Sequence, residues 1–127
     1  MTVLNETQKM LQKALEDERL LVKLLDDIEI SDAILGFHAQ QSVEKLFKAL
    51  LFKLGTEFPR THDLGFLYEL ISKQGLSLPI SIDELEGLTT YAVTWRYDEP
   101  SFSTMERIQM LSLVTAVKLW VHEEVLK

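Results

Sequence analysis

Apolar residues recur at helical spacing along nearly the whole chain, and prolines interrupt this pattern at only three positions, 59, 79 and 100. Residues three, four and seven apart share one face of an α-helix, so the pattern is typical of amphipathic helices. Proline is costly inside a helix and marks connections. No segment alternates as a strand does, because Pro79 breaks the apolar run of residues 76–82. The sequence therefore predicts an all-α, up-and-down helical bundle.

About five helices are expected from the periodicity and from the residues that begin and end each one. Ser31 suits the N-cap of the second helix, and Gly55 suits the left-handed residue after its last turn. A capping box that starts at Ser81 precedes the fourth helix, and another that starts at Ser103 precedes the fifth. The expected helices span about residues 3–27, 32–54, 63–73 (closed by Gly75), from after Ser81 to a point within 91–95, and from after Ser103 to about 125.

Composition limits the classes of protein that this chain can belong to. Its 127 residues form one expected domain, 1–127. Cysteine is absent, which excludes a disulfide scaffold and a thiol nucleophile and suits the cytoplasm. The uncharged run 108–117 is too short to cross a membrane, which takes about 20 residues. The three histidines lack metal-ligand spacing, so neither a metal nor a cofactor is expected.

One segment is basic within an otherwise acidic chain. Residues 33–62 carry four lysines and arginines against two glutamates, whereas the whole chain has a net charge of -7. Local positive charge in an acidic protein can mark a phosphate site, although lysines can equally form a solvated helix face. His38, Gln41, Lys45 and Lys48 follow at spacings of three, four and three, and so share one side of the second helix. A histidine in such a place can instead be a hydrogen-bonded structural residue.

Two further segments carry polar residues that packing alone does not require. Before the third helix, Thr61 or His62 is expected as the N-cap, while Arg60 and His62 are placed to face a phosphate at the helix N-terminus. Residues 91–98 combine aromatic side chains with Arg96 and Tyr97. This second segment is either an aromatic hinge that closes the core or part of a ligand site.

The expected ligand site lies where these segments meet the polar side of the second helix. Arginine suits bidentate contact with phosphate, lysine supplies a point charge, tyrosine can stack on a base, and histidine can donate to a phosphate oxygen. The second helix is about 35 Å long, so the residues meet only if the third helix folds back antiparallel to it or a dimer joins them. The candidate ligand-binding residues are His38, Gln41, Lys45, Arg60, His62, Arg96 and Tyr97.

Three segments of the chain resemble the signatures of HEPN domains. They are residues 37–45 (Phe-His-Ala-Gln-Gln-Ser-Val-Glu-Lys) with 48–50, residues 60–64 (Arg-Thr-His-Asp-Leu), and residues 91–93 with 96–97. The resemblance implies a bundle of about five helices that usually pairs as a homodimer. It also implies frequent association with a small nucleotidyltransferase, in pairs that act as toxin and antitoxin.

Many HEPN domains are metal-independent ribonucleases, whose motif is an arginine, four to six further residues and a histidine. This chain departs from that motif. The positions at which the histidine is expected hold Gly65, Phe66 and Leu67 after Arg60, and Ser101, Phe102 and Ser103 after Arg96. The departure favours a non-catalytic HEPN module that binds a nucleotide or RNA, a partner minimal nucleotidyltransferase, or both. The alternative is a metal-independent ribonuclease toxin with a rearranged site of His38, Arg60, His62 and Arg96, so the sequence assigns no catalytic residue.

A homodimer is also expected from the width of the apolar surfaces. The second helix carries Phe37 and Leu51 on a second side, and the fifth carries Ile108, Leu111 and Leu119 beside its main stripe. A single bundle rarely covers so wide an apolar arc, and exposed patches usually mark interfaces. The alternative is that the third and fourth helices cover these positions.

Overall fold

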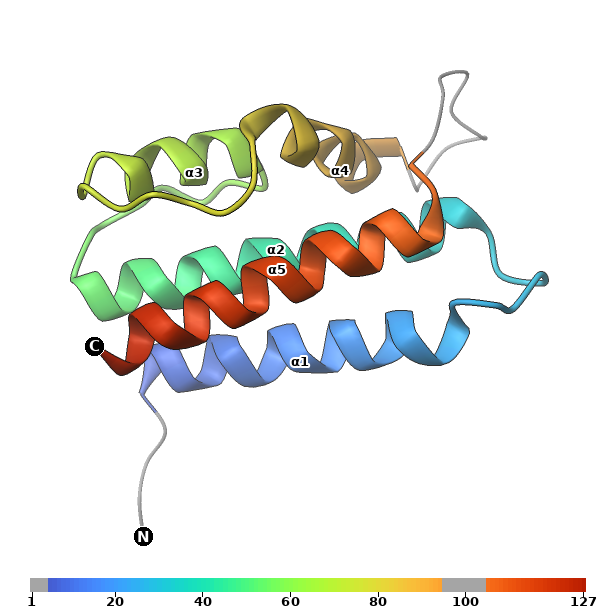
Figure 1. The fold of residues 1–127 in the computed structure, drawn as a ribbon, viewed down its shortest axis with the longest axis horizontal. Coiled ribbons are helices and arrows are strands. Elements are labelled where there is room, and N and C mark those ends of the chain that lie inside the picture. The colour runs from blue at the N-terminus through green and yellow to red at the C-terminus, as the bar shows by residue number, and fades with distance from the viewer. Residues whose placement is uncertain (1–4, 95–104) are drawn as a thin grey trace, which may run out of the picture.

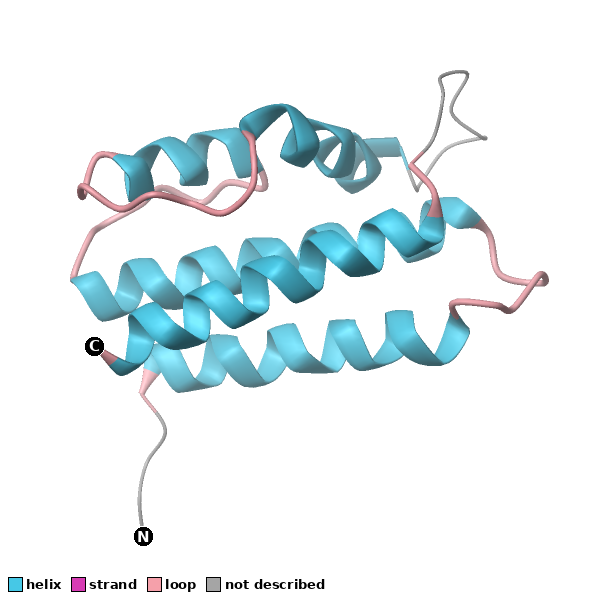
Figure 2. Cartoon of the chain, in the orientation of Figure 1, coloured by secondary structure: helices cyan, strands magenta, loops and turns pink. Residues whose placement is uncertain are grey.

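All regular secondary structure in the described part of the protein is helical. A computed structural model describes residues 5–94 and 105–127, and these residues contain helices and no strand (Figure 2). The helices are α1 (Glu6–Leu24), α2 (Asp32–Leu54), α3 (Leu64–Ser72), α4 (Ile82–Thr94) and α5 (Arg107–Leu126). This confirms the all-α fold class. None of these helices has the length and apolar character needed to span a bilayer.

Helix α2 is the centre of the bundle and contacts each of the other four helices. The long helices α1, α2 and α5 lie alongside one another, with α1 antiparallel to the other two (Figure 1). The shorter helices α3 and α4 contact each other and cover α2 from another side (Figure 1). Because α2 is surrounded in this way, only part of its circumference is left for polar residues.

The connection between α2 and α3 differs from the expected one. Residues 55–63 run back along α2 as an irregular segment, and the Nε2 group of Gln40 donates to the backbone oxygen of His62 at 3.0 Å. Helix α3 then runs in about the same direction as α2 (Figure 1). The expectation that the third helix itself folds back antiparallel is therefore wrong, because the loop containing Pro59 makes the return.

Local capping explains most of the helix ends. The Ser31 hydroxyl accepts from the backbone of Ile34 at 3.2 Å, and Gly55 closes α2 with a φ of 69°, as expected. Ser81 and Glu84 exchange hydrogen bonds as a capping box at the start of α4. A side-chain oxygen in this position satisfies an N–H group that the helix itself cannot pair.

The starts of two helices differ from the sequence prediction. Asp63, and not Thr61 or His62, caps α3, because its carboxylate accepts from the backbone of Phe66 at 3.2 Å. Helix α5 begins at Arg107 after a capping box of Glu106 with Gln109, later than the predicted start. Ser103, the predicted cap, lies outside the described residues.

Helix α1 ends at Leu24, before the predicted residue 27, and an arginine from α5 binds the carbonyls of the residues that follow it. The Arg107 guanidinium donates to the backbone oxygens of Leu25 at 3.0 Å and Asp27 at 2.9 Å, and also to that of Ile30. Its Nε donates to the Asp32 carboxylate at 2.7 Å. One side chain therefore fastens the end of α1 and the loop that follows it to the start of α5.

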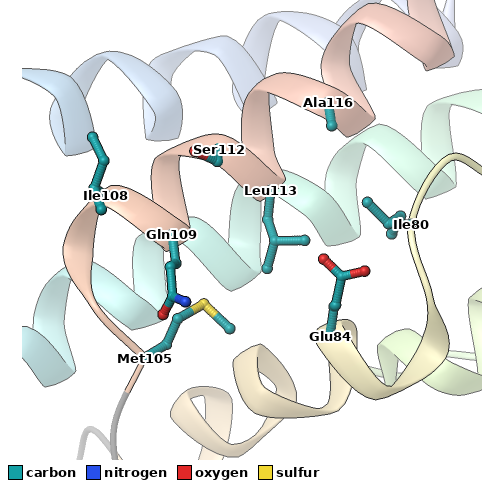
Figure 3. A pocket seen from close by; sticks show the side chains of 8 residues that line it. All are labelled: Ile80, Glu84, Met105, Ile108, Gln109, Ser112, Leu113 and Ala116. Atoms are coloured by element: carbon teal, nitrogen blue, oxygen red, sulfur yellow. The ribbon is translucent and has the colours of Figure 1, made fainter.

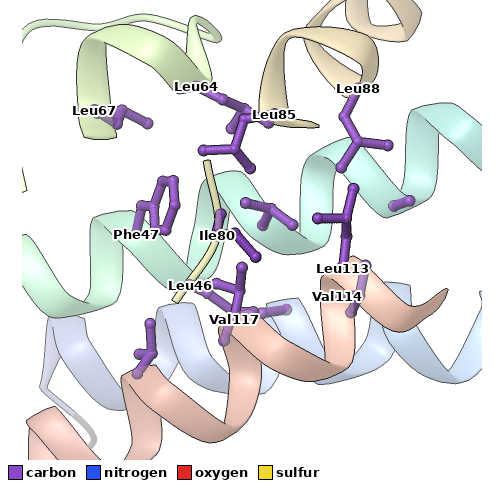
Figure 4. Close-up of a cluster of buried hydrophobic side chains, with 14 of the residues drawn as sticks. Leu46, Phe47, Leu64, Leu67, Ile80, Leu85, Leu88, Leu113, Val114 and Val117 are labelled. Atoms are coloured by element: carbon purple, nitrogen blue, oxygen red, sulfur yellow. The ribbon is translucent and has the colours of Figure 1, made fainter. Parts of the chain in front are cut away.

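The apolar core lies between α2 and the helices around it. Figure 4 shows side chains from α2, α3, α4 and α5 converging on the same interior. Leu51, which we expected on a second apolar side available to a partner, is fully buried in this core, so that interpretation is wrong for this residue. At Gly36 the Tyr91 ring packs directly on the backbone of α2, where an added Cβ atom would lie 2.5 Å from it. This contact sets the close approach of α4 to α2.

Candidate functional site

Two acidic side chains organise the polar side of α2, and the first of them comes from α1. Asp17 faces α2, and its carboxylate accepts from His38 Nδ1 at 2.9 Å and from Lys45 Nζ at 2.6 Å. The Asp17 side chain is only 11% exposed. Since a carboxylate cannot donate, the Nδ1 atom of His38 carries the hydrogen of this bond. We call Asp17, His38 and Lys45 the Asp17 cluster.

The second acidic side chain lies on α2 itself. The Glu44 carboxylate accepts from His62 Nδ1 at 2.9 Å, from Lys48 Nζ at 3.0 Å and from Gln40 Nε2 at 3.0 Å. The Glu44 side chain is 5% exposed, so these bonds compensate for the loss of water around a charge. Because Gln40 also bonds the backbone oxygen of His62, the loop is fastened by both its main chain and its side chain. We call Gln40, Glu44, Lys48 and His62 the Glu44 cluster.

A strip of α2 separates the two clusters. His38 and Lys45 reach toward α1, whereas Gln40 and Glu44 reach toward the loop, and at 3.6 residues per turn Gln41 falls between them. Gln41 Nε2 donates to Gln40 Oε1 at 2.8 Å, which links the middle of the strip to the Glu44 cluster. The two histidines therefore lie on opposite edges of one polar strip.

The two histidines differ sharply in exposure. The side chain of His62 is 67% exposed and that of His38 is 26% exposed. Each uses Nδ1 on a buried carboxylate, so Nε2 is the atom left for another partner. A carboxylate that holds Nδ1 fixes the ring and its tautomer, as in enzymes and in metal sites. Both rings are held in place, but only His62 is largely open to solvent.

Arg60 adds a cation to the loop that carries His62. It is exposed, and within residues 5–94 and 105–127 no hydrogen bond or ion pair joins it to another side chain. Lys45, Lys48 and Arg60 set against Asp17 and Glu44 give a formal charge of +1 before any histidine is protonated, on a chain of net charge -7. Asp63, exposed beside His62, brings this sum to zero, so the strip is close to neutral on an acidic protein.

The structure brings four of the seven candidate residues to this strip and its edge. His38, Gln41 and Lys45 lie on α2, the loop brings His62 to Glu44 at the edge of the strip, and Arg60 is exposed two residues before His62 in the same loop. Arg96 and Tyr97 lie outside the described residues. Within the described ranges, no three histidine or acidic side chains are arranged to hold a metal ion.

Sequence reasoning missed the residues that hold this site together. Asp17 stands between Ala14 and Leu21 on the buried face of α1, and an acidic residue inside an apolar stripe is a signal that it has a partner. Glu44 follows Gln40 and precedes Lys48 at spacings of four, which places the three side chains one above the other on the helix. Both signals are visible in the sequence, but neither one identifies the histidines as partners.

Comparison with known families gives one match. The family model of the HEPN domain matches residues 7–124, which is nearly the whole chain and includes all five helices apart from the ends of α1 and α5. Comparison with curated proteins and with solved structures yields no match.

Proposed function

Since the chain belongs to the HEPN domain family, whose members have nucleotide- and RNA-related roles, we propose that it binds the phosphate of a nucleotide or RNA without cleaving it. The binding surface is the polar strip of α2 with Arg60 and His62 at its edge. A partner minimal nucleotidyltransferase, as in toxin–antitoxin pairs of the family, is the proposed protein partner.

The observation that supports phosphate binding is an exposed Arg60 two residues before a fixed His62. Lys45 and Lys48 are already paired with buried carboxylates, so much of their charge is compensated within the protein. Arg60 has no such partner among the described residues, and a free guanidinium suits bidentate contact with a phosphate. Glu44 holds the neighbouring His62 ring through Nδ1, and Nε2 can donate to the same anion in the imidazolium form, in which both ring nitrogens carry hydrogen.

The experiment compares Arg60, the proposed phosphate-binding cation of the loop, with a cation on α2. We expect a labelled single-stranded RNA and a labelled mononucleotide to bind the wild type, with fluorescence anisotropy as the measurement. Arg60→Ala should weaken binding about tenfold, which corresponds to about 1.4 kcal/mol. Lys53→Ala removes an exposed cation from the last turn of α2, outside both clusters, and serves as the matched control. Equal losses in the two variants would show only nonspecific attraction to a basic segment.

The minimal nucleotidyltransferase partner calls for a separate test. Co-expression of the chain with a nucleotidyltransferase encoded beside it should give a complex that survives gel filtration. If the two proteins elute separately while RNA still binds, the partner proposal fails and the nucleotide proposal stands.

One observation favours a second candidate, a metal-independent ribonuclease. A carboxylate on Nδ1 and a solvent-exposed Nε2 is the arrangement of a histidine that can transfer protons, and Glu44 and His62 have it. The candidate predicts cleavage of RNA in the presence of a metal chelator, with loss of cleavage in His62→Ala. Intact RNA after incubation with the wild type would leave binding as the function.

HEPN domains often dimerise, and we propose that this chain forms a two-fold homodimer. The support is that several large apolar side chains remain exposed on the helices, most of all on α5. A two-fold dimer is the commonest closed assembly of identical chains.

A further inference from the structure

The outward side of α5 carries two large apolar side chains that the described residues leave more than half exposed. Ile108 is 58% exposed and Leu119 is 59% exposed. Apart from Leu126 in the last turn of α5, they are the most exposed large apolar side chains in the described helices. Exposed apolar side chains grouped on one helix face usually mark an interaction surface.

Ile108 and Leu119 belong to a strip of uncharged residues along one side of the helix, which we call the α5 strip. At 3.6 residues per turn its members share one side of the helix. Its members are Ile108, Leu111, Ser112, Thr115, Ala116 and Leu119. Neighbouring charges of α5 are engaged elsewhere, because Arg107 bonds Asp32 and Lys118 pairs with Glu18 at 2.8 Å. On a chain of net charge -7, an uncharged strip is a surface on which a second acidic copy can make contact without setting carboxylates directly against one another.

A pocket lies beside the strip, between α5 and the start of α4. It has a volume of about 290 Å³, and Ile80, Glu84 and Met105 line it opposite residues of the strip. Figure 3 shows Leu113 and the Glu84 side chain at this pocket, with Ile108, Ser112 and Ala116 along the α5 ribbon. The pocket gives the strip a recess on one flank, which an apolar side chain of a partner can enter.

We infer that the α5 strip is the seam of the homodimer, with the two α5 helices packed antiparallel across the two-fold axis. In this arrangement a residue of one copy lies opposite the residue of the other copy for which the two numbers add up to 227. Ile108 then packs on the partner's Leu119 at both ends of the seam, and Ser112 faces the partner's Thr115 near the axis. Small side chains at the crossing allow the helices to approach to about 8 Å, and the large pairs close the two ends. The inference rests on the homodimer proposed above and is independent of nucleotide binding.

Charge favours the antiparallel over the parallel arrangement. A parallel pair would bring the two Glu123 carboxylates to the same end of the seam. The antiparallel pair instead places each Glu123 at the N-terminal end of the partner's helix, where the helix dipole favours negative charge.

The absence of cysteine makes this geometry directly testable. We would prepare Ile108→Cys and Leu119→Cys as separate variants, one of them with a mass tag, mix them and oxidise them mildly. The antiparallel seam predicts a disulfide between the two variants. It predicts none within either variant alone, because the same residue in the two copies is 11 positions apart along the seam, about 16 Å, and a disulfide needs Cα atoms within about 7 Å.

Sedimentation velocity separates failure of the seam from failure of the dimer. We expect a wild-type dimer, a monomeric Leu119→Asp variant, and an unchanged dimer for Phe66→Asp, which places a charge at an exposed apolar position on α3. A monomeric wild type would overturn both the homodimer and the seam. A wild-type dimer that persists in Leu119→Asp, or disulfides within each single variant, would overturn the antiparallel seam alone.

Discussion

The Asp17 and Glu44 clusters use the same chemistry in two different settings. In each, one buried carboxylate accepts from the Nδ1 atom of a histidine and from the Nζ atom of a lysine on α2. The Asp17 cluster lies between α1 and α2. The Glu44 cluster joins a helix to an irregular loop, and a glutamine adds two further hydrogen bonds there.

This difference in setting separates two roles for the same pair of residue types. In the Asp17 cluster both the histidine and the lysine belong to α2, so the cluster fastens α1 to α2. In the Glu44 cluster the histidine comes from the loop, and the cluster holds a ring that is otherwise open to solvent. We therefore expect the Asp17 cluster to matter mainly for stability, and the Glu44 cluster to matter for both stability and binding.

The largest effect is expected from Glu44→Ala. The substitution leaves Lys48, which is itself mostly buried, without its counterion, and it releases the side chain of His62. Removing one partner of a buried ion pair typically costs about 3–5 kcal/mol, so we expect the free energy of unfolding to fall by about 3 kcal/mol in urea denaturation. A loss below about 1 kcal/mol would show that the cluster does not hold the loop.

Asp17→Ala should cost less, about 1–2 kcal/mol, because Lys45 and His38 are partly exposed and can regain water. The same urea measurement, made on both variants, gives the ranking of the two clusters. If Asp17→Ala lowers the free energy of unfolding more than Glu44→Ala does, this ranking is wrong, because the contact between α1 and α2 would then be the better buried of the two settings.

The fold was largely predictable from the sequence because its signals are local. The period of the leucines, the three prolines and the caps at Ser31, Gly55 and Ser81 each act within a few residues. The errors at the ends of α1 and α3 come from groups that compete for the same backbone atoms. Arg107 takes carbonyls 77 to 82 positions earlier in the chain, and no local rule anticipates such a contact.

The candidate site was only partly predictable, because its geometry depends on separations of 18 to 28 residues. Helical spacing alone placed His38, Gln41 and Lys45 on one side of α2. It did not show that Asp17 would engage two of them, or that an extended loop would bring His62 back to Glu44. Those contacts depend on how α1 and the loop pack on α2, which is a property of the whole bundle.

The histidines themselves allow the two roles to be compared directly. His62→Ala should leave the free energy of unfolding within about 1 kcal/mol of the wild type, because the ring is exposed, while weakening RNA binding several-fold. His38→Ala should show the reverse, with reduced stability and nearly unchanged affinity. Urea denaturation and fluorescence anisotropy on the two variants measure both quantities, and equal effects of the two on binding would mean that both edges of the strip contact the ligand.

The smallest expected effect is that of Arg60→Lys, and it tests how the phosphate is held. The side chain is exposed, so stability should change by less than about 0.5 kcal/mol. Lysine keeps the charge but cannot offer the two parallel N–H groups of a guanidinium, so affinity should fall about two- to threefold. Because the number of neutralised phosphates is unchanged, the slope of log affinity against log salt should stay as in the wild type, whereas Arg60→Ala should reduce it by about one. A lysine variant that binds as weakly as the alanine variant would show that the guanidinium fork, and not its charge, is what the anion requires beside the fixed ring of His62.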